Sequence, residues 1–149
     1  MKRQRILQTV GLATAALLII SACTIGKPEI TIEAPEDGSQ FVAGYDVHFA
    51  TLLVDSLGLK SYSIEITGKE GEVDNSDCVV PFSFKQTWDL RDLPDEKLSF
   101  QHHHEIIIAE NAAPGNYIFT LSCKNKAGRK STVSKNIIII TPASLPAPF

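Results

Sequence analysis

Short apolar runs separated by turn-forming residues make up most of the chain from residue 29 onward. The runs are rich in Ile, Val, Phe, Thr and Tyr, and the segments between them contain Gly, Pro, Asn and Asp. This pattern is typical of β-strands joined by turns, and no long segment has helical periodicity. The predicted strands are 29–34, 40–42, 45–54, 60–67, 79–85, 98–108, 116–124 and 131–140. The sequence therefore predicts one all-β domain over residues 29–141.

Alternation along these strands assigns side chains to faces, because successive strand residues point to opposite sides of a sheet. The predicted inward rows are Tyr62, Ile64 and Ile66, and then Tyr117, Phe119, Leu121 and Cys123. Residues 137–140 are apolar on both sides, so this segment is either covered by a neighbouring element or an exposed edge. Seven or eight strands at mostly regular spacing favour an immunoglobulin-like, two-sheet antiparallel sandwich.

The first 22 residues have the organisation of an export signal. Three basic residues, Lys2, Arg3 and Arg5, precede an apolar stretch at 10–22 that is too short to span the ~30 Å hydrocarbon core of a bilayer. This stretch ends in Ile20-Ser21-Ala22-Cys23, which resembles the bacterial lipobox. The resemblance implies cleavage before Cys23 and attachment of lipid to its thiol. The alternative is an ordinary secretory signal followed by a coincidental cysteine.

Charge changes the picture of the predicted mature chain. The full chain of 149 residues has 17 acidic and 14 basic residues, and loss of residues 1–22 leaves a net charge of −6. An acidic chain without nucleic-acid motifs is not expected to bind nucleic acid. Membrane attachment would then depend on more than one acyl chain, and not on attraction to anionic lipids.

The segments on either side of the predicted domain are short. Residues 24–28 form a tether of at most roughly 17 Å, and residues 142–149 form a Pro-rich tail. Thr24, and not Asp, follows Cys23, which resembles lipoproteins destined for the outer membrane. We expect an outer-membrane lipoprotein that faces the periplasm, with exposure at the cell surface left open.

Three motifs carry a resemblance to a family. They are the histidines before the Ile-rich run 106–108, the turn Ala112-Ala113-Pro114-Gly115-Asn116-Tyr117, and the turn Asn125-Lys126-Ala127-Gly128-Arg129. Gly115-Asn116-Tyr117 also resembles the tyrosine corner of immunoglobulin-like sandwiches, in which the tyrosine hydroxyl bonds to nearby backbone. With the lipobox, the chain is similar to single-domain bacterial lipoproteins of immunoglobulin-like fold, common in Bacteroidetes, that have no assigned function.

One cluster of side chains has the composition of a metal site. On a strand, His102 and His104 point one way while His103 and Glu105 point the other. The strand that holds His48 neighbours this one in an immunoglobulin-like topology. Imidazoles from the two strands suit Zn²⁺ or Cu²⁺, with Glu105 as an oxygen ligand. The alternative is that these are ordinary polar strand residues.

With Cys23 assigned to lipid, Cys78 and Cys123 remain. An exported domain meets an oxidising compartment, in which this pair can form a disulfide. The alternative is two separate thiols, of which Cys123 is buried.

Motifs of common catalytic sites are missing, among them Gly-x-Ser-x-Gly, the phosphate-binding glycine loop and His-Glu-x-x-His. We therefore expect a non-catalytic interaction domain in the bacterial cell envelope. Its partner is expected to be an envelope protein, engaged for example by strand addition at residues 137–140, or a glycan. A metal-binding envelope lipoprotein that uses the histidines is the alternative function.

Overall fold

The computed structural model describes residues 26–94 and 98–142, and the strands in these ranges number eight. They are β1 (Glu29–Ala34), β2 (Ser39–Val42), β3 (Asp46–Val54), β4 (Leu59–Val73), β5 (Phe84–Asp89), β6 (Ser99–Ile107), β7 (Gly115–Asn125) and β8 (Lys130–Ile140). The predicted all-β class is confirmed, because every regular element in these ranges is a strand and none of the described residues lies in an α-helix. In particular, these ranges contain no helix long and apolar enough to cross a membrane.

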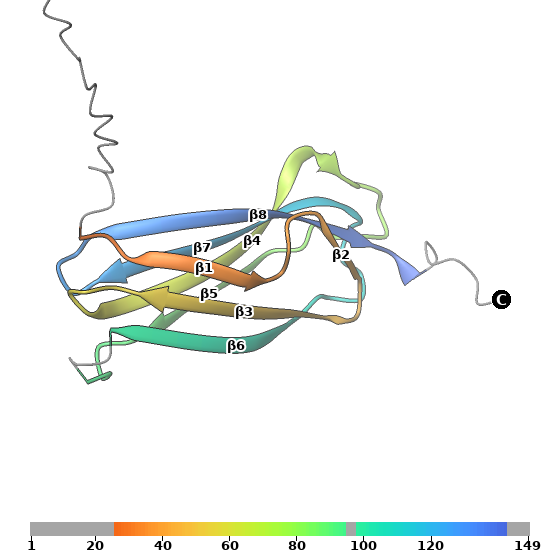
Figure 1. The fold of residues 1–149 in the computed structure, drawn as a ribbon. Helices are drawn as coiled ribbons and strands as arrows, with labels where there is room; N and C mark the ends of the chain where they lie inside the picture. The colour runs from red at the N-terminus through yellow and green to blue at the C-terminus, as the bar shows by residue number, and fades with distance from the viewer. Residues whose placement is uncertain (1–25, 95–97, 143–149) are drawn as a thin grey trace, which may run out of the picture.

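The strands form two layers that pack face to face (Figure 1). One sheet has the order β1-β3-β6, and the other has the order β2-β8-β7-β4-β5. All neighbouring strands run antiparallel except β2 and β8, which are parallel. This parallel pair arises because the chain changes sheets at residues 35–38, so that β1 pairs with β3 and β2 pairs with β8. The predicted immunoglobulin-like sandwich is confirmed, with one parallel pair added.

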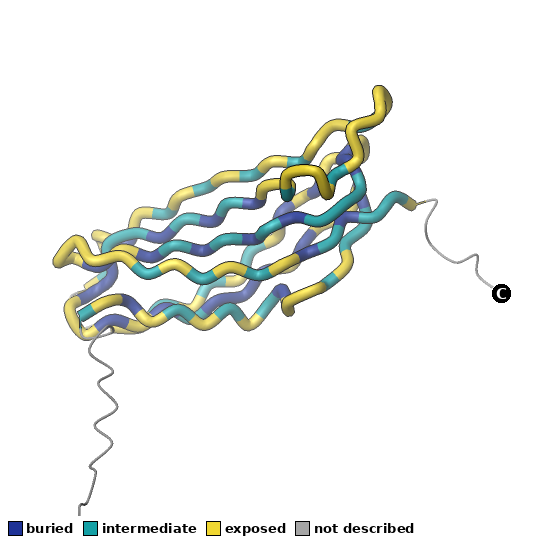
Figure 2. Tube along the Cα trace, turned by 90° about the horizontal axis from the view of Figure 1, so that it is seen from above, coloured by how far each residue is buried: buried dark blue, intermediate teal, exposed yellow. Residues whose placement is uncertain are grey.

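Alternating side chains build the core between the two sheets. The burial pattern of β7 shows the alternation most clearly, with every second residue from Tyr117 to Cys123 buried. Tyr62, Ile64 and Ile66 of β4 lie between the same layers. Figure 2 shows this alternation of buried and exposed positions along the strands. The predicted inward rows are therefore confirmed, and they account for much of the hydrophobic stabilisation.

The predicted tyrosine corner is also present at the start of β7. The hydroxyl of Tyr117 donates a hydrogen bond to the backbone oxygen of Ala113 over 2.7 Å and accepts one from the backbone N–H of Phe82 over 3.1 Å. Gly115 is required here, because a Cβ at this position would lie 2.4 Å from the backbone oxygen of Glu72. The corner therefore joins β7 to the connection that precedes β5.

Two predicted boundaries in the middle of the chain are wrong. β4 continues to Val73 through a segment expected to be a turn, and the strand expected at 79–85 is displaced to Phe84–Asp89. Of residues 79–83, only Val80 makes a bridge, to Ala112. The turn residues Gly68 and Gly71 misled the assignment, because an irregularity in the β4–β7 register accommodates this segment without ending the strand.

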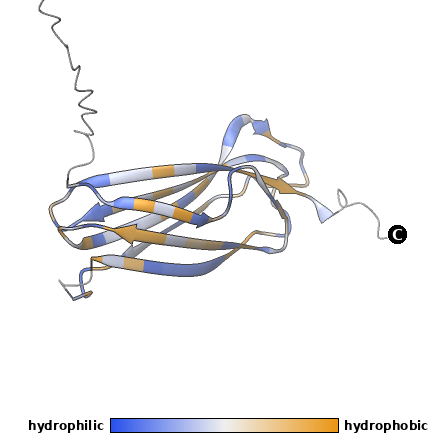
Figure 3. Cartoon of the chain, viewed as in Figure 1, coloured by the Kyte–Doolittle hydropathy of each residue, from blue (hydrophilic) through white to orange (hydrophobic). Residues whose placement is uncertain are grey.

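The apolar segment at the end of β8 is a central part of its sheet. Residues 137–140 pair with β7 on one side and with all four residues of β2 on the other. This end of β8 is strongly hydrophobic in Figure 3. Strand addition at Ile137–Ile140 is therefore ruled out in this fold, because β2 already occupies that edge.

Candidate functional site

The histidines predicted as a cluster lie on β3 and β6, which pair along their whole length. Phe49 is opposite His104, Thr51 is opposite His102, and His48 is opposite Glu105. His102 and His104 are half-buried between the sheets, whereas His103 and Glu105 are exposed on the outer face. The predicted division of the three histidines between two faces is correct.

On the inner side, His102 and His104 are part of a group of rings that we call the aromatic edge cluster. Its members are Phe49, Tyr62, Trp88, Phe100, His102 and His104. Within the described residues, β5 and β6 are the outermost strands of their sheets. The cluster lies between these two edge strands and closes the sandwich there. In Figure 3, β6 is largely blue because it contains many polar residues.

Trp88 is at the centre of this cluster. Its ring stacks on Tyr62 with centroids 4.7 Å apart and planes 7° from parallel. The rings of His102 and His104 are nearly perpendicular to it, with centroids 5.4 and 5.5 Å from the Trp88 centroid. These are favourable stacked and edge-to-face geometries for aromatic rings. Trp88 is therefore a partly buried residue that packs against the edge of the core.

A hydrogen bond joins the Tyr62 hydroxyl to Nδ1 of His102, with the hydroxyl as donor when Nδ1 carries no proton. Burial raises the pKa of Tyr62, and Cys123 adds to this effect. Burial also lowers the pKa of His102, and the nearby His104 and His103 lower it further. Both groups are therefore neutral at neutral pH, which suits their position between two apolar layers. Sequence reasoning missed this pair, because residues 40 positions apart carry no local signal.

On the outer face, His48 and His103 stack with ring centroids 5.7 Å apart. The predicted metal site combined His48, His102, His103, His104 and Glu105. The structure separates them into an outer group and an inner group, because alternation sends neighbouring residues of β6 to opposite faces. In the part of the chain that the structure describes, no three His, Cys, Asp or Glu side chains are grouped to hold a metal ion. The five residues therefore do not form one site for Zn²⁺ or Cu²⁺.

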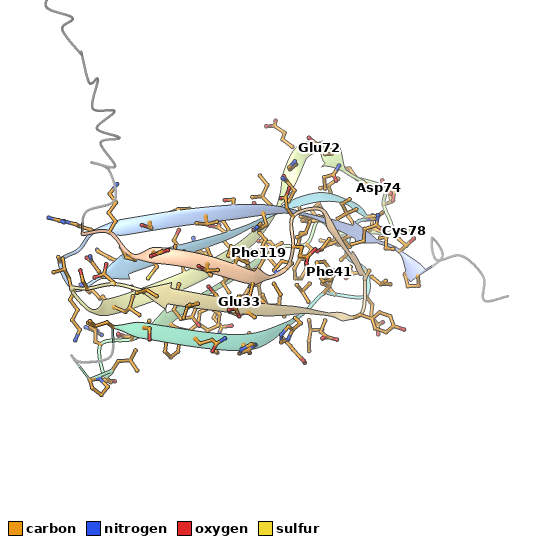
Figure 4. All side chains as sticks on the ribbon, viewed as in Figure 1. Glu33, Phe41, Glu72, Asp74, Cys78 and Phe119 are labelled. Carbon is orange, nitrogen blue, oxygen red and sulfur yellow. The ribbon has the colours of Figure 1, made fainter. Side chains whose placement is uncertain are left out.

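The disulfide between Cys78 and Cys123 is not formed. Both cysteines are free thiols, Cys78 exposed and Cys123 buried. Cys78 lies two residues before Val80, which is bridged to Ala112 near the start of β7, while Cys123 is near the end of β7. The start of β7, near Cys78, and the position of Cys123 are about eight residues of extended strand apart, which is roughly 26 Å. Figure 4 labels Cys78 at the end of the molecule opposite the start of β1.

A second buried polar contact, also missed by sequence reasoning, lies where the described chain begins. Asn125 is fully buried, and its Nδ2 donates to the backbone oxygen of Gly26 over 2.8 Å and to Oδ2 of Asp55 over 3.1 Å. Its Oδ1 accepts from the backbone N–H of Arg129 over 2.9 Å. Asn125 was assigned only to a turn. It holds the segment before β1 against the β3–β4 and β7–β8 turns.

The predicted lipobox, Ile20, Ser21, Ala22 and Cys23, lies outside the described residues. The first described residue, Gly26, is three positions after Cys23. The lipidation site therefore remains a prediction of the sequence.

Fold and core together define an immunoglobulin-like β-sandwich domain. Residues 21–140 match the family described as Domain of unknown function (DUF4625), and the chain belongs to this family. No curated protein sequence is significantly similar to the chain.

Three solved structures are similar in backbone. The fibronectin(III)-like modules of CbhA from Clostridium thermocellum share 15% identity at a TM-score of 0.44, over 78% of this chain and 100% of theirs. A DUF4466 family protein from Parabacteroides merdae shares 13% identity at a TM-score of 0.48, over 72% of this chain and 42% of its own. A Niemann-Pick type C2 protein from the Japanese carpenter ant shares 13% identity at a TM-score of 0.45, over 77% of this chain and 92% of its own.

Proposed function

We propose that this protein is a lipoprotein of the bacterial cell envelope whose β-sandwich acts as a non-catalytic interaction domain. The observation that carries the proposal is the sequence Ile20-Ser21-Ala22-Cys23 at the end of a short apolar stretch with a basic head. A thiol is the lipid acceptor in this class of anchor, and small residues before it fit the peptidase. The family match starts at residue 21 and so includes the cysteine.

The geometry at the start of the domain agrees with a short anchor. Only residues 24 and 25 separate Cys23 from Gly26, whose backbone oxygen is held by buried Asn125. Three residues span at most about 10 Å. An acyl group on Cys23 would therefore hold this end of the sandwich close to the bilayer surface.

A non-catalytic role is supported by the state of the histidines. His102 and His104 pack edge-on against Trp88, and His102 is hydrogen-bonded to Tyr62. These rings form the edge of the core, and Tyr62 holds its proton because its pKa is raised. We propose that the domain binds an envelope protein or a glycan through its exposed faces, on the outer membrane and toward the periplasm.

The test of the anchor is incorporation of labelled palmitate into the full chain, expressed in a bacterium that processes lipoproteins. We expect label in the wild type and in a Cys78→Ser control, and none in Cys23→Ser. The mass of the N-terminal peptide should show cleavage before Cys23. An unlabelled wild-type chain, cleaved elsewhere, would identify an ordinary secretory signal and refute the anchor.

The location is tested separately by membrane fractionation followed by protease treatment of intact cells. The proposal predicts the protein in the outer-membrane fraction and protected from protease until the outer membrane is permeabilised. Digestion in intact cells would place the domain on the cell surface instead.

A further inference from the structure

Charge is strongly segregated along the long axis of the sandwich. One end comprises the start of β1, the β3–β4 and β7–β8 turns and the end of β5, and we call it the anchor end because the chain leads from it to Cys23. Its basic residues are Lys27, Lys60, Arg91, Lys124, Lys126, Arg129 and Lys130, and its acidic residues are Glu29, Asp55, Asp89 and Asp92. The net charge of the anchor end is +3. Residues 95–97 lie outside the described ranges and are not counted.

The rest of the described domain has the opposite sign. It contains eleven acidic residues but only Lys69, Lys85 and Lys135 as basic ones, a net charge of −8. Glu72 and Asp74 are labelled in Figure 4 at the end remote from the start of β1. The overall net charge of −6 for residues 23–149, taken alone, therefore conceals a molecule with a positive end and a negative end.

The positive charge at the anchor end is concentrated around the exit of the chain. Lys124, Lys126, Arg129 and Lys130 are all exposed on or beside the β7–β8 turn. The Arg129 side chain lies so close to Gly26 that a Cβ built on this glycine would overlap its guanidinium. Asp89 is paired with Arg91, so these two charges offset each other, and Asp55 is buried beneath Asn125. The cations thus surround the point from which the tether leaves.

Distance decides which end governs the interaction with a charged surface. Eleven residues of β8 extend roughly 36 Å, several times the Debye length of about 8 Å at physiological salt. A bilayer that meets the anchor end is therefore screened from the acidic far end. Free in solution, the acidic domain is weakly repelled by an anionic membrane, but once tethered it presents its positive end.

We propose that the anchor end docks on the anionic phospholipid headgroups of the leaflet that holds the acyl chains of Cys23. The basic surface of Lys124, Lys126, Arg129 and Lys130 contacts the phosphates, so the sandwich stands on the membrane with its acidic end directed away. This inference rests on the proposed anchor for its geometry. It adds a second, electrostatic contact that orients the domain and presents the remote loops to partners.

The test uses Trp88, the single tryptophan, as an intrinsic fluorescent donor near the anchor end of β5. The chain from Cys23 to Phe149, with Cys78→Ser to remove the exposed thiol, is coupled through Cys23 to vesicles that carry maleimide lipids. The vesicles also carry dansyl headgroup acceptors, in either pure phosphatidylcholine or a mixture with phosphatidylglycerol. The measurement is energy transfer from Trp88 to dansyl.

We expect more transfer on the anionic vesicles, and loss of the excess at high salt. Each cation near an anionic surface changes the docking equilibrium by about fivefold. The triple substitution Lys124→Gln, Lys126→Gln and Lys130→Gln should reduce the docked-to-undocked ratio by at least about tenfold. The matched control, with Lys69→Gln, Lys85→Gln and Lys135→Gln, should retain it. Circular dichroism verifies that both variants are folded.

Equal transfer on neutral and anionic vesicles would overturn the inference. It would also be overturned if the control variant lost as much transfer as the anchor-end variant. Since the chemical coupling replaces biological lipidation, either outcome leaves the palmitate test of the anchor unaffected. Conversely, a chain that is not lipidated in cells but docks here would refute the anchor alone.

Discussion

At the scale of single residues, two sets of polar contacts connect segments of the chain through specific hydrogen bonds, which apolar packing does not provide. Asn125 connects Gly26, Asp55 and Arg129 at the anchor end, and Tyr62 is bonded to His102 in the aromatic edge cluster. A buried polar group is costly unless it is hydrogen-bonded, so each partner depends on the other. Loss of one partner leaves the other desolvated and unpaired.

Asn125→Ala is expected to lower the free energy of unfolding by about 2 kcal/mol or more, because it removes a donor from the buried carboxylate of Asp55 and from the Gly26 carbonyl. Urea denaturation measures this change. Asn75→Ala, on an exposed loop, is the control and should have little effect. Equal stabilities of the two variants would show that the Asn125 contacts contribute nothing.

Stability should depend on pH through His102. Its pKa is lowered in the folded protein, chiefly by burial, from an ordinary value of 6.5. The unfolded chain therefore binds this proton at a higher pH than the folded chain. The stabilisation is complete above pH 6.5 and is lost as pH falls through 6.5 toward the folded pKa.

We expect the free energy of unfolding to fall between about pH 7.5 and about pH 5.5, and to fall less in His102→Phe, which does not titrate. Chemical denaturation at both pH values measures the two slopes. His48→Phe, on the outer face, is the matched control and should retain the wild-type slope. An unchanged slope in His102→Phe would assign the pH dependence to other groups.

At the scale of elements, the short strand β2 has a larger role than its four residues suggest. It pairs in parallel with residues 137–140 of β8 and so covers the most apolar edge of the five-stranded sheet. Phe41 of β2 packs against the core, while its neighbour Gln40 is exposed. An uncovered apolar edge is a template for aggregation.

Phe41→Asp is expected to release β2, to destabilise the protein by about 2–4 kcal/mol and to promote aggregation on mild heating. Light scattering and thermal denaturation measure the two effects. Gln40→Asp places the same charge one residue away on the exposed side, and it should remain monomeric and stable. Aggregation of both variants to the same extent would contradict a specific role for the partly buried Phe41 ring.

At the scale of the whole molecule, the two ends of the sandwich differ in charge and in the state of their cysteines. Cys78 is exposed near the acidic end, whereas Cys123 is buried toward the anchor end beside Tyr62. Burial, with a smaller contribution from Asp55, raises the pKa of Cys123 to about 12. The distance between Cys78 and Cys123 along the sandwich excludes a disulfide between them without rearrangement of the fold.

Thiol counting on the chain from residue 24 onward should therefore find one reactive thiol in the native protein and two after denaturation without reductant. Cys78→Ser should abolish the native reaction, because the buried thiol of Cys123 is neither accessible nor ionised at neutral pH. Finding no thiols in the denatured wild type would establish the disulfide.

Local patterns were sufficient to predict most of the fold. The alternation in residues 60–67 and 116–124 assigned Tyr62, Ile64, Tyr117 and Phe119 to the core correctly, because strand geometry sends every second residue to the same face. The tyrosine corner was predicted from three adjacent residues. The predicted export signal and lipobox also depend on local sequence alone, because they are defined by a short run of adjacent residues that ends at Cys23.

Only the tertiary structure decided which distant residues meet. The pairing of β2 with β8, the contact of Tyr62 with His102 and the position of Asn125 beneath Gly26 all join segments far apart in the chain. Their energies depend on burial and on strand order, and neither leaves a local pattern. For the same reason composition reported one net charge, while the fold arranged those charges into a positive end and a negative end.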